Sequence, residues 1–260
     1  MNIPIYQVDA FAEKPFEGNP AAVCPLDKWL PDETLQAIAS ENNLSETAFF
    51  IPRDDCYDLR WFTPVSEVDL CGHATLASAH VVFSKYKPNR SKILFKTRSG
   101  SLPVSRDGER LTLDFPAQPG VKCPTPDPLL KSLGITPIEC YQSTDLMAVF
   151  DNQAQIEQMA PDFRILKEID SRGIIVTAPG EDADFVSRFF APRHNIDEDP
   201  VTGSAHCTLA PYWSEILGSN HLTAKQLSNR TGLLRCEIAG DRVMITGKSR
   251  LYLEGEIFVD

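Results

Sequence analysis

The sequence lacks several features that mark special classes of protein. No apolar run approaches the roughly 20 residues that a membrane-spanning helix needs, and residues 1–9 have neither the basic nor the apolar region of a secretory signal. The seven cysteines are scattered and form no C-x-x-C pair. This argues against a disulfide framework or a zinc site and fits reduced thiols. We therefore expect a cytoplasmic protein with no membrane partner.

Basic residues are also in short supply. The chain of 260 residues has 25 Lys and Arg against 36 Asp and Glu, which gives a net charge of −11. Nucleic acid is therefore not an expected partner, because phosphate binding needs a basic face. No G-x-G-x-x-G or Walker sequence is present, so nucleotide-binding folds are disfavoured. The hydrophobic content of 42% is that of a globular protein.

What the sequence does contain is one pattern that occurs twice, about half a chain apart. Each copy has an Arg-x-Phe-x-Pro motif, acidic residues, and then a glycine that opens a run of small residues typical of a helix. The copies are Arg60 to Pro64 with Cys71-Gly72-His73, and Arg188 to Pro192 with Thr202-Gly203-Ser204. We predict two similar halves, residues 1–118 and 119–260, whose closing strands could cross back to complete the first half. The two glycine loops would then face one cleft.

Hydrophobic periodicity predicts many strands and two helices in each half. The expected strands are 3–10, 21–24, 47–51, 57–62, 93–95, 102–104 and 111–115, then 139–142, 147–150, 173–177, 185–190, 233–238, 242–246 and 251–259. The expected helices are 31–42, 74–86, 153–159 and 204–217, and residues 116–128, with five prolines, are the expected linker. This order favours an α+β fold in which a curved, mostly antiparallel sheet wraps around a central helix in each half.

Glu46 directly precedes a predicted apolar strand. A carboxyl group in a largely dry pocket has its pKa raised by desolvation, which suits it to take and return a proton. The alternative is an exposed acid in a turn or at a helix end.

The two glycine loops are candidates for binding a carboxylate. Glycine lets the backbone approach a ligand, and the amides at the start of a helix favour an anion. His73 could instead cap the helix or fill the core. Cys71 could serve as a thiol base, but its counterpart is Thr202, so a two-thiol racemase is not supported.

Three further polar positions lie near these loops. Asp199 could orient a polar substrate group or relay a proton, or it could cap the helix, whereas Glu198 is expected to be solvated. Asn19, in the Gly18-Asn19-Pro20 turn, either reaches the cleft or holds the turn. His194 and His206 have no partners at ligand spacing, so we expect no metal site.

Six motifs in order resemble the PhzF (phenazine biosynthesis isomerase-like) family. They are Val8-Asp9-Ala10-Phe11, Phe16-x-Gly18-Asn19-Pro20, Leu44-Ser45-Glu46-Thr47, Arg60-x-Phe62-Thr63-Pro64, Cys71-Gly72-His73-Ala74 and Glu198-Asp199-Pro200-Val201-Thr202-Gly203-Ser204. Gln226, Arg230, Gly232 and the Val243-x-Ile245-x-Gly247 run extend the resemblance over essentially the whole chain.

The resemblance implies the diaminopimelate-epimerase-like fold, an active site between two similar halves, a homodimer and no cofactor. In the family's phenazine enzyme a glutamate moves a proton on the substrate ring, and the matching residue is Glu46. The supporting His, Asp and Ser of that phenazine enzyme match His73, Asp199 and Ser204. Cys71 departs from the phenazine enzyme and is typical of family members whose substrate is unknown.

We therefore predict a cofactor-independent isomerase of a small carboxylate-bearing metabolite. The predicted catalytic residues are Glu46, His73 and Asp199, and the predicted substrate-binding residues are Asn19, Cys71, Gly72, Thr202, Gly203 and Ser204. The alternatives are an epimerase or racemase of an amino-acid-like substrate, and an inactive protein that only binds a small molecule.

Overall fold

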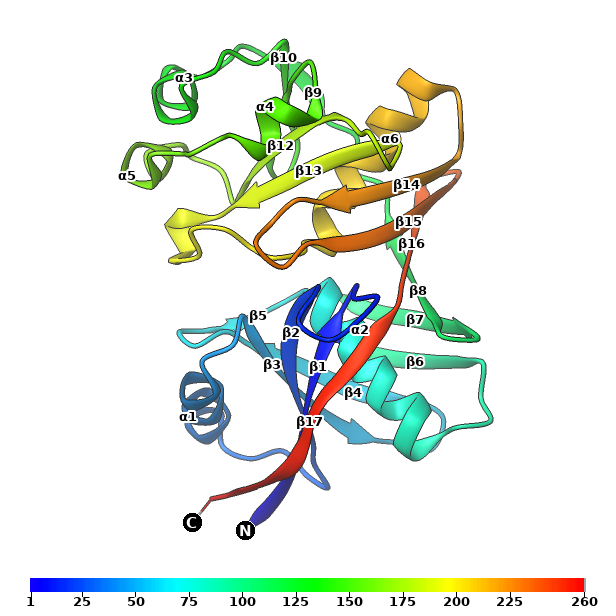
Figure 1. Cartoon of the computed structure of the whole chain (residues 1–260). Helices are drawn as coiled ribbons and strands as arrows, with labels where there is room; N and C mark the ends of the chain where they lie inside the picture. The colour runs from blue at the N-terminus through cyan, green and yellow to red at the C-terminus, as the bar shows by residue number, and fades with distance from the viewer. Residues whose placement is uncertain (260) are drawn as a thin grey trace. The chain divides into compact units, whose positions relative to one another are not determined.

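The computed structural model describes residues 1–259, and the chain divides into two compact units (Figure 1). Unit 1 comprises Met1–Asp114 and the residues from Thr246 on, and unit 2 comprises Phe115–Ile245. The chain leaves unit 1 within strand β8 (Arg110–Pro116) and returns to it within strand β16 (Arg242–Gly247).

The sheet of unit 1 mixes antiparallel and parallel pairs. Antiparallel pairs join β17 to β1, β1 to β2, β3 to β4, β4 to β5, β6 to β7 and β7 to β8, and parallel pairs join β2 to β3 and β4 to β6. The strands are β1 (Asn2–Ala10), β2 (Asn19–Pro25), β3 (Glu46–Pro52), β4 (Tyr57–Phe62), β5 (Glu67–Val68), β6 (Lys92–Thr97), β7 (Gly100–Asp107) and β17 (Ser249–Phe258).

Helix α2 (Gly72–Val81) is the central helix of unit 1. All of its residues except His80 are buried, and it packs against β1, β2 and β3. A π-helical turn, η1 (Val82–Tyr86), continues it. Helix α1 (Asp32–Asn42) adds Leu35 and Ile38 to a second apolar cluster that includes Phe49 of β3. Strand β3 is thus covered on both faces, which explains its unbroken apolar run.

Unit 2 is built on a similar plan. Its strands are β9 (Val121–Cys123), β10 (Glu139–Gln142), β11 (Leu146–Val149), β12 (Ile174–Pro179), β13 (Phe185–Phe190), β14 (His221–Gln226) and β15 (Gly232–Ala239). Its helices are α3 (Asp127–Leu133), α4 (Gln153–Glu157), α5 (Phe163–Leu166) and α6 (His206–Leu217), with 3-10 turns η2 (Pro192–His194) and η3 (Gly203–Ala205). Trp213 of α6 donates a 2.9 Å hydrogen bond to Thr177 of β12.

The order of strand pairs repeats between the units. In unit 1, β2–β3 is parallel, β3–β4 antiparallel, β4–β6 parallel and β6–β7 antiparallel. In unit 2, β11–β12, β12–β13, β13–β14 and β14–β15 follow the same four steps. Strand β4 therefore corresponds to β13, and α2 corresponds to α6. The predicted similarity of the two halves is confirmed.

The Arg-x-Phe-x-Pro motif has the same structural role in both units. Arg60 donates to both carboxylate oxygens of Glu67 at 2.6 and 2.7 Å, and Arg188 does so to Glu198 at 2.7 and 2.9 Å. Each guanidinium also lies 5.0 Å from the ring of the phenylalanine two residues on. The expectation that Glu198 is solvated is wrong, because Arg188 holds its carboxylate in a half-buried pair.

Two other expectations differ from the structure. Residues 116–128 are not a free linker, because β9 pairs with β10 and α3 begins at Asp127. Strand β14 and the short α3 and α5 were not predicted. Among residues 1–259, none of the helices combines the length and apolar character of a membrane span.

Candidate active site

Glu46 and His73 meet where β3 and α2 begin. Oε2 of Glu46 lies 2.9 Å from Nε2 of His73, and the two side chains are 12% and 5% exposed. Neither atom makes a well-directed hydrogen bond within residues 1–259, so the contact is close but not ideally aligned. The reading of Glu46 as an exposed turn acid is therefore not what this geometry favours.

Asn19 lies on the other side of the His73 ring. The parallel pairing of β2 with β3 sets Ala21 beside Glu46, and Asn19 is two residues earlier on β2. Its Nδ2 is 3.2 Å from Nδ1 of His73. The amide suits both states of the ring, because its NH2 group can donate to a neutral Nδ1 and its oxygen, after a flip, can accept from a protonated one.

The environment of His73 favours the imidazolium form. Burial alone would lower its pKa, but the hydrogen bond with Cys71 and the charge of Glu46 raise the pKa well above the usual value of 6.5. Burial and the Glu46 carboxylate also raise the pKa of the Cys71 thiol, so this group stays neutral. The Glu46 carboxyl group and the His73 ring thus form a largely buried pair.

Three groups of this cluster are also potential metal ligands. Donor atoms of Glu46, Cys71 and His73 lie within 4.8 Å of one another. However, Sγ of Cys71 faces Nδ1 of His73 at 3.6 Å, whereas Glu46 faces Nε2. The thiol and the carboxylate therefore approach different ring nitrogens, and we assign no ion to this cluster.

The start of α2 supplies backbone donors beside this cluster. Cys71 is the N-cap residue, no side chain caps the helix, and the Thr75 amide makes the first backbone bond, to Cys71 O at 3.2 Å. The amides of the first turn, which begins at Gly72, have no carbonyl partner within the helix. They give the site an electropositive edge that suits a developing negative charge.

In unit 2, Asp199 and Thr202 are held together by Gln226. Thr202 Oγ1 donates to Oδ2 of Asp199, and the Thr202 amide donates to Gln226 Oε1 at 2.8 Å. Gln226 Nε2 donates to the Asp199 carbonyl at 2.8 Å. All three residues are buried. Asp199 is therefore part of a fixed loop, with its carboxylate oriented by a hydroxyl group.

Gly203 and Ser204 form the turn η3 at the start of α6. Ser204 Oγ accepts a 3.2 Å hydrogen bond from Nη2 of Arg172, which is itself paired with Asp145. No sequence motif marks Arg172 or Asp145. Their joint position at the Ser204 loop follows only from the fold.

His206 supports the same loop from inside. It is fully buried, and its Nδ1 donates to the Thr202 carbonyl at 2.9 Å. Burial lowers its pKa to about 4, so the ring is neutral. His206 thus supports the shape of the loop through its hydrogen bond to the Thr202 carbonyl.

The predicted site residues form two groups. Unit 1 brings together Asn19, Glu46, Cys71, Gly72 and His73, and unit 2 brings together Asp199, Thr202, Gly203 and Ser204. That both groups serve one active site stays a prediction.

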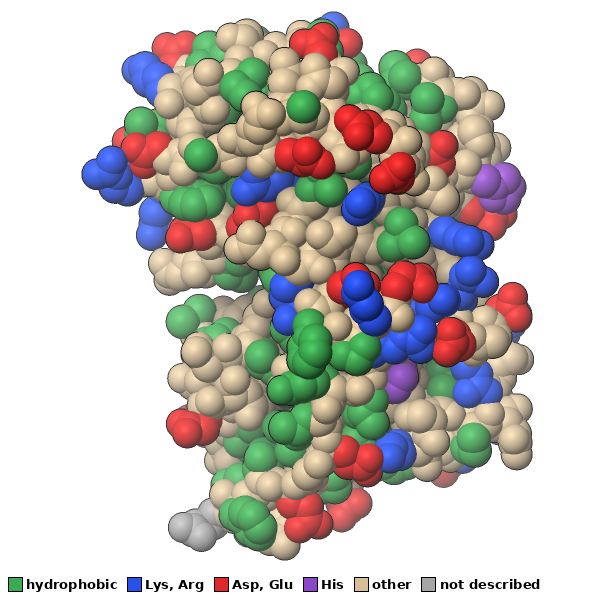
Figure 2. Space-filling view, in the orientation of Figure 1, with side chains coloured by type: hydrophobic (Ala, Val, Ile, Leu, Met, Phe, Trp, Pro, Cys, Tyr) green, Lys and Arg blue, Asp and Glu red, His purple; other side chains and the backbone are tan. Residues whose placement is uncertain are grey.

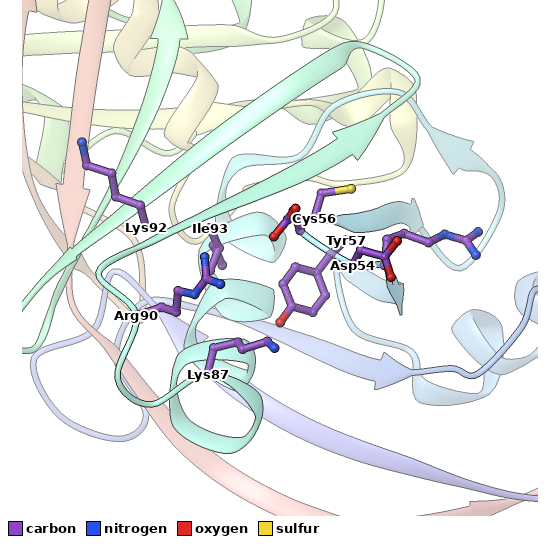
Figure 3. A pocket seen from close by; sticks show the side chains of 9 residues that line it. Asp54, Cys56, Tyr57, Lys87, Arg90, Lys92 and Ile93 are labelled. Carbon is purple, nitrogen blue, oxygen red and sulfur yellow. The ribbon is translucent and has the colours of Figure 1, made fainter.

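A surface pocket elsewhere in unit 1 includes none of these residues. It surrounds Tyr57 and is lined by charged side chains such as Asp54, Lys87 and Arg90 (Figure 3). The pairing of Tyr57 with Pro52 places it at the end of β3 opposite Glu46. This pocket has no contact with the Glu46–His73 pair and carries no catalytic role here.

Comparisons with known proteins agree with the family resemblance. The family model for phenazine biosynthesis-like proteins matches residues 8–255. An uncharacterized isomerase of Pseudomonas aeruginosa is 54% identical over 257 residues, which cover 99% of each chain. The crystal structure of a PhzF-family phenazine biosynthesis protein from Enterococcus faecalis matches 100% of both chains, with a TM-score of 0.97 and 46% identity.

A more distant neighbour shows the fold alone. A hydroxyproline epimerase from Agrobacterium vitis has a TM-score of 0.63 at 10% identity, with 98% of this chain and 92% of that chain covered. With the family match, this places the architecture in the epimerase-like fold. The chain therefore belongs to the PhzF family of phenazine biosynthesis-like proteins, has the diaminopimelate-epimerase-like fold, and is an enzyme of the isomerase class.

Proposed function

We propose that the chain is a cofactor-independent isomerase that shifts a proton on a small carboxylate-bearing metabolite. Glu46 is the acid–base residue. The observation that carries this proposal is the 2.9 Å contact between Glu46 and His73 in a nearly water-free setting. A carboxylate next to an imidazolium gives a proton two adjacent positions, which suits repeated transfer.

In the proposed reaction, Glu46 removes a proton from a carbon next to an unsaturated or carbonyl group. Its Oε2 is buried against His73, so Oε1 is the oxygen that meets the substrate. The amides that begin α2 stabilise the negative charge that develops. Glu46 then returns the proton at another carbon of the same face, and Asp199 of unit 2 is a proposed proton relay.

The Glu46→Gln variant tests this role. Glutamine keeps the size and one oxygen of the side chain but cannot accept a proton from carbon, so ligand binding should persist while turnover falls at least about 100-fold. The assay is deuterium uptake from heavy water across a metabolite panel, followed by mass spectrometry. Glu41→Gln, an exposed change on α1, is the control and should leave the rate unchanged. A Glu46→Gln enzyme with a normal rate would remove Glu46 from the mechanism.

The same assay separates the alternatives. An isomerase moves a double bond, whereas an epimerase incorporates deuterium with inversion at a single carbon, and NMR of the product distinguishes the two. A protein that only binds its ligand would show neither. The intact set of Glu46, His73 and Asp199 argues against the last alternative, because binding alone does not need an acid–base pair.

A further inference from the structure

Arg172 is held in a fixed orientation by a buried acid. Its Nε donates to Oδ1 of Asp145 at 2.8 Å, and its Nη2 donates to Oδ2. The Asp145 side chain is 1% exposed, whereas that of Arg172 is 38% exposed. The acid is thus buried, whereas part of the arginine side chain is open to solvent. Two parallel hydrogen bonds fix the plane of the group as well as its position.

The contact with Ser204 orients a second donor. Because Nη2 of Arg172 donates to Ser204 Oγ at 3.2 Å, the serine oxygen is the acceptor and its own hydrogen is left to donate elsewhere. Nη1 of Arg172 takes part in no hydrogen bond within residues 1–259. The free Nη1 and the serine hydroxyl are therefore donors on neighbouring side chains.

The loop that carries Arg172 is shaped for this position. A Cβ atom at Gly173 would lie 2.1 Å from Cζ of Phe189, so only glycine allows this ring to pack there. The same ring lies 5.8 Å from the Arg172 guanidinium carbon. Phe189 thus supports the loop and covers one side of the guanidinium.

Arg188 shows what a purely structural arginine looks like in the same unit. Its Nε and Nη2 bind Glu198, and its Nη1 donates to the carbonyls of Ile156 and Met159 at 3.0 and 2.7 Å. Every nitrogen of Arg188 is used, and its side chain is largely buried. Arg172 differs on both points, because Nη1 makes no hydrogen bond to any described residue and the side chain is 38% exposed.

We propose that Arg172, oriented by Asp145, is a carboxylate-binding residue, and that it binds the carboxylate together with the Ser204 hydroxyl. One carboxylate oxygen accepts from Nη1 of Arg172, and the other accepts from the Ser204 hydroxyl. The Nε and Nη2 groups stay bound to Asp145 and Ser204, so they hold the guanidinium in place while Nη1 meets the ligand. This subsite depends on the proposed function only for the class of ligand that it binds.

Malonate, a small dicarboxylate, is the probe, and malonamide is its neutral analogue. In NMR titrations of the full chain, malonate should shift the Ser204 amide and the Arg172 Nε signals with a dissociation constant on the order of 1 mM, and malonamide should not. The Arg172→Met/Asp145→Asn double variant removes both charges and leaves no buried acid unpaired. It should bind malonate at least about tenfold more weakly.

Arg193→Met is the matched control. Arg193 is similarly exposed, at 42%, and is also paired with an aspartate, Asp170, in the same unit. This variant should bind malonate like the unmodified protein. Glu46→Gln should also bind normally, so a loss of turnover in that variant is separable from a failure of this subsite.

Two results would overturn the proposal. One is a double variant that binds malonate with normal affinity. The other is an unmodified protein whose Arg172 and Ser204 signals do not move with malonate, or move equally with malonamide. The second result is observed without any variant, so the proposal stays open to refutation if a substitution impairs folding.

Discussion

The Cys71 thiol lies beside the Glu46–His73 pair and stays neutral. Its Sγ lies 3.6 Å from Nδ1 of His73, close enough for proton exchange. If the thiol ionised, the cluster would hold two buried anions beside one imidazolium, which is costly at low dielectric. Burial and Glu46 both raise the pKa of this thiol. Cys71 is thus better suited to a neutral hydrogen-bonding role than to that of a base.

Replacing Cys71 should therefore have a modest effect. The Cys71→Ala enzyme should keep at least about a tenth of the turnover, a loss within about 1.4 kcal/mol of transition-state stabilisation. The deuterium-uptake assay measures this, with Cys56→Ala, a cysteine outside the site, as control. Full inactivation by Cys71→Ala, or rapid alkylation of this thiol in the folded protein at neutral pH, would favour a thiol-based racemase instead.

The site could be predicted from the sequence only where local patterns marked it. Glu46 stands before an apolar strand and His73 follows a glycine at a helix start, so both could be proposed from the sequence. Their mutual contact depends on how β3 and α2 pack, which no local pattern encodes. Arg172 was missed because a single arginine in a loop has no signature, and its partner Asp145 is 27 positions away along the chain.

Among the secondary-structure elements, β14 has a role that its sequence does not indicate. Its last residue, Gln226, is buried and binds the loop between Asp199 and Thr202 at both ends. The loop's own hydrogen bond, from Thr202 to Asp199, closes the arrangement. The position of the Asp199 carboxylate therefore depends on a strand that follows it by more than 20 residues.

Loss of the Gln226 amide should destabilise this loop. Gln226→Leu would leave the buried Thr202 amide and Asp199 carbonyl without their partner, at a cost of about 1–3 kcal/mol in the free energy of unfolding. Urea denaturation measures this, and hydrogen exchange should speed up at the Thr202 amide. Gln142→Leu, at an exposed site on β10, is the control. Unchanged stability and unchanged exchange in Gln226→Leu would show that the loop holds its own shape.

Most elements could be predicted because their apolar residues follow a clear period. The predicted helix over 74–86 corresponds to α2 and η1, and the strand over 185–190 matches β13. The elements that were missed are short or polar. Strand β9 lies among prolines, which remove backbone donors and normally indicate a linker, yet antiparallel pairing with β10 orders it.

At the scale of the whole molecule, the structural repeat has diverged in chemistry. Corresponding positions hold Cys71, Gly72 and His73 in unit 1 and Thr202, Gly203 and Ser204 in unit 2. Unit 1 has the carboxylate–imidazole pair, whereas unit 2 has a hydroxyl group beside an arginine. The proposed proton-transfer group and the proposed anion-binding group thus lie on equivalent turns of one fold. The homodimer that the family resemblance implies stays a prediction. Exposed apolar side chains gather over β17 (Figure 2), where Leu251, Tyr252 and Leu253 lie.

Three histidines with shifted pKa values make opposite contributions to the free energy of unfolding as the pH changes. The pKa of His73 is raised in the folded protein. The stabilisation that His73 adds to the folded state is therefore complete below pH 6.5 and is lost as the pH rises through the folded-state pKa. Burial lowers the pKa of His206 to about 4, and burial with Arg250 and Lys85 does the same for His80. These two contributions are complete above pH 6.5 and are lost as the pH falls towards 4. Within that acidic window the contribution of His73 is constant.

We therefore expect His206 to cause a measurable part of the fall in the free energy of unfolding at acidic pH. Between pH 6.5 and 4 the unfolded chain takes up a proton at this residue and the folded chain does not, which removes up to about 3 kcal/mol of stability. His206→Gln cannot take up that proton, so its free energy of unfolding should fall less between about pH 7 and about pH 5. His194→Gln, at an exposed position in the same unit, should keep the full decrease. Urea unfolding at the two pH values measures both. If His206→Gln lost as much stability on acidification as the unmodified protein, carboxylates rather than buried imidazoles would govern the acid limit of this fold.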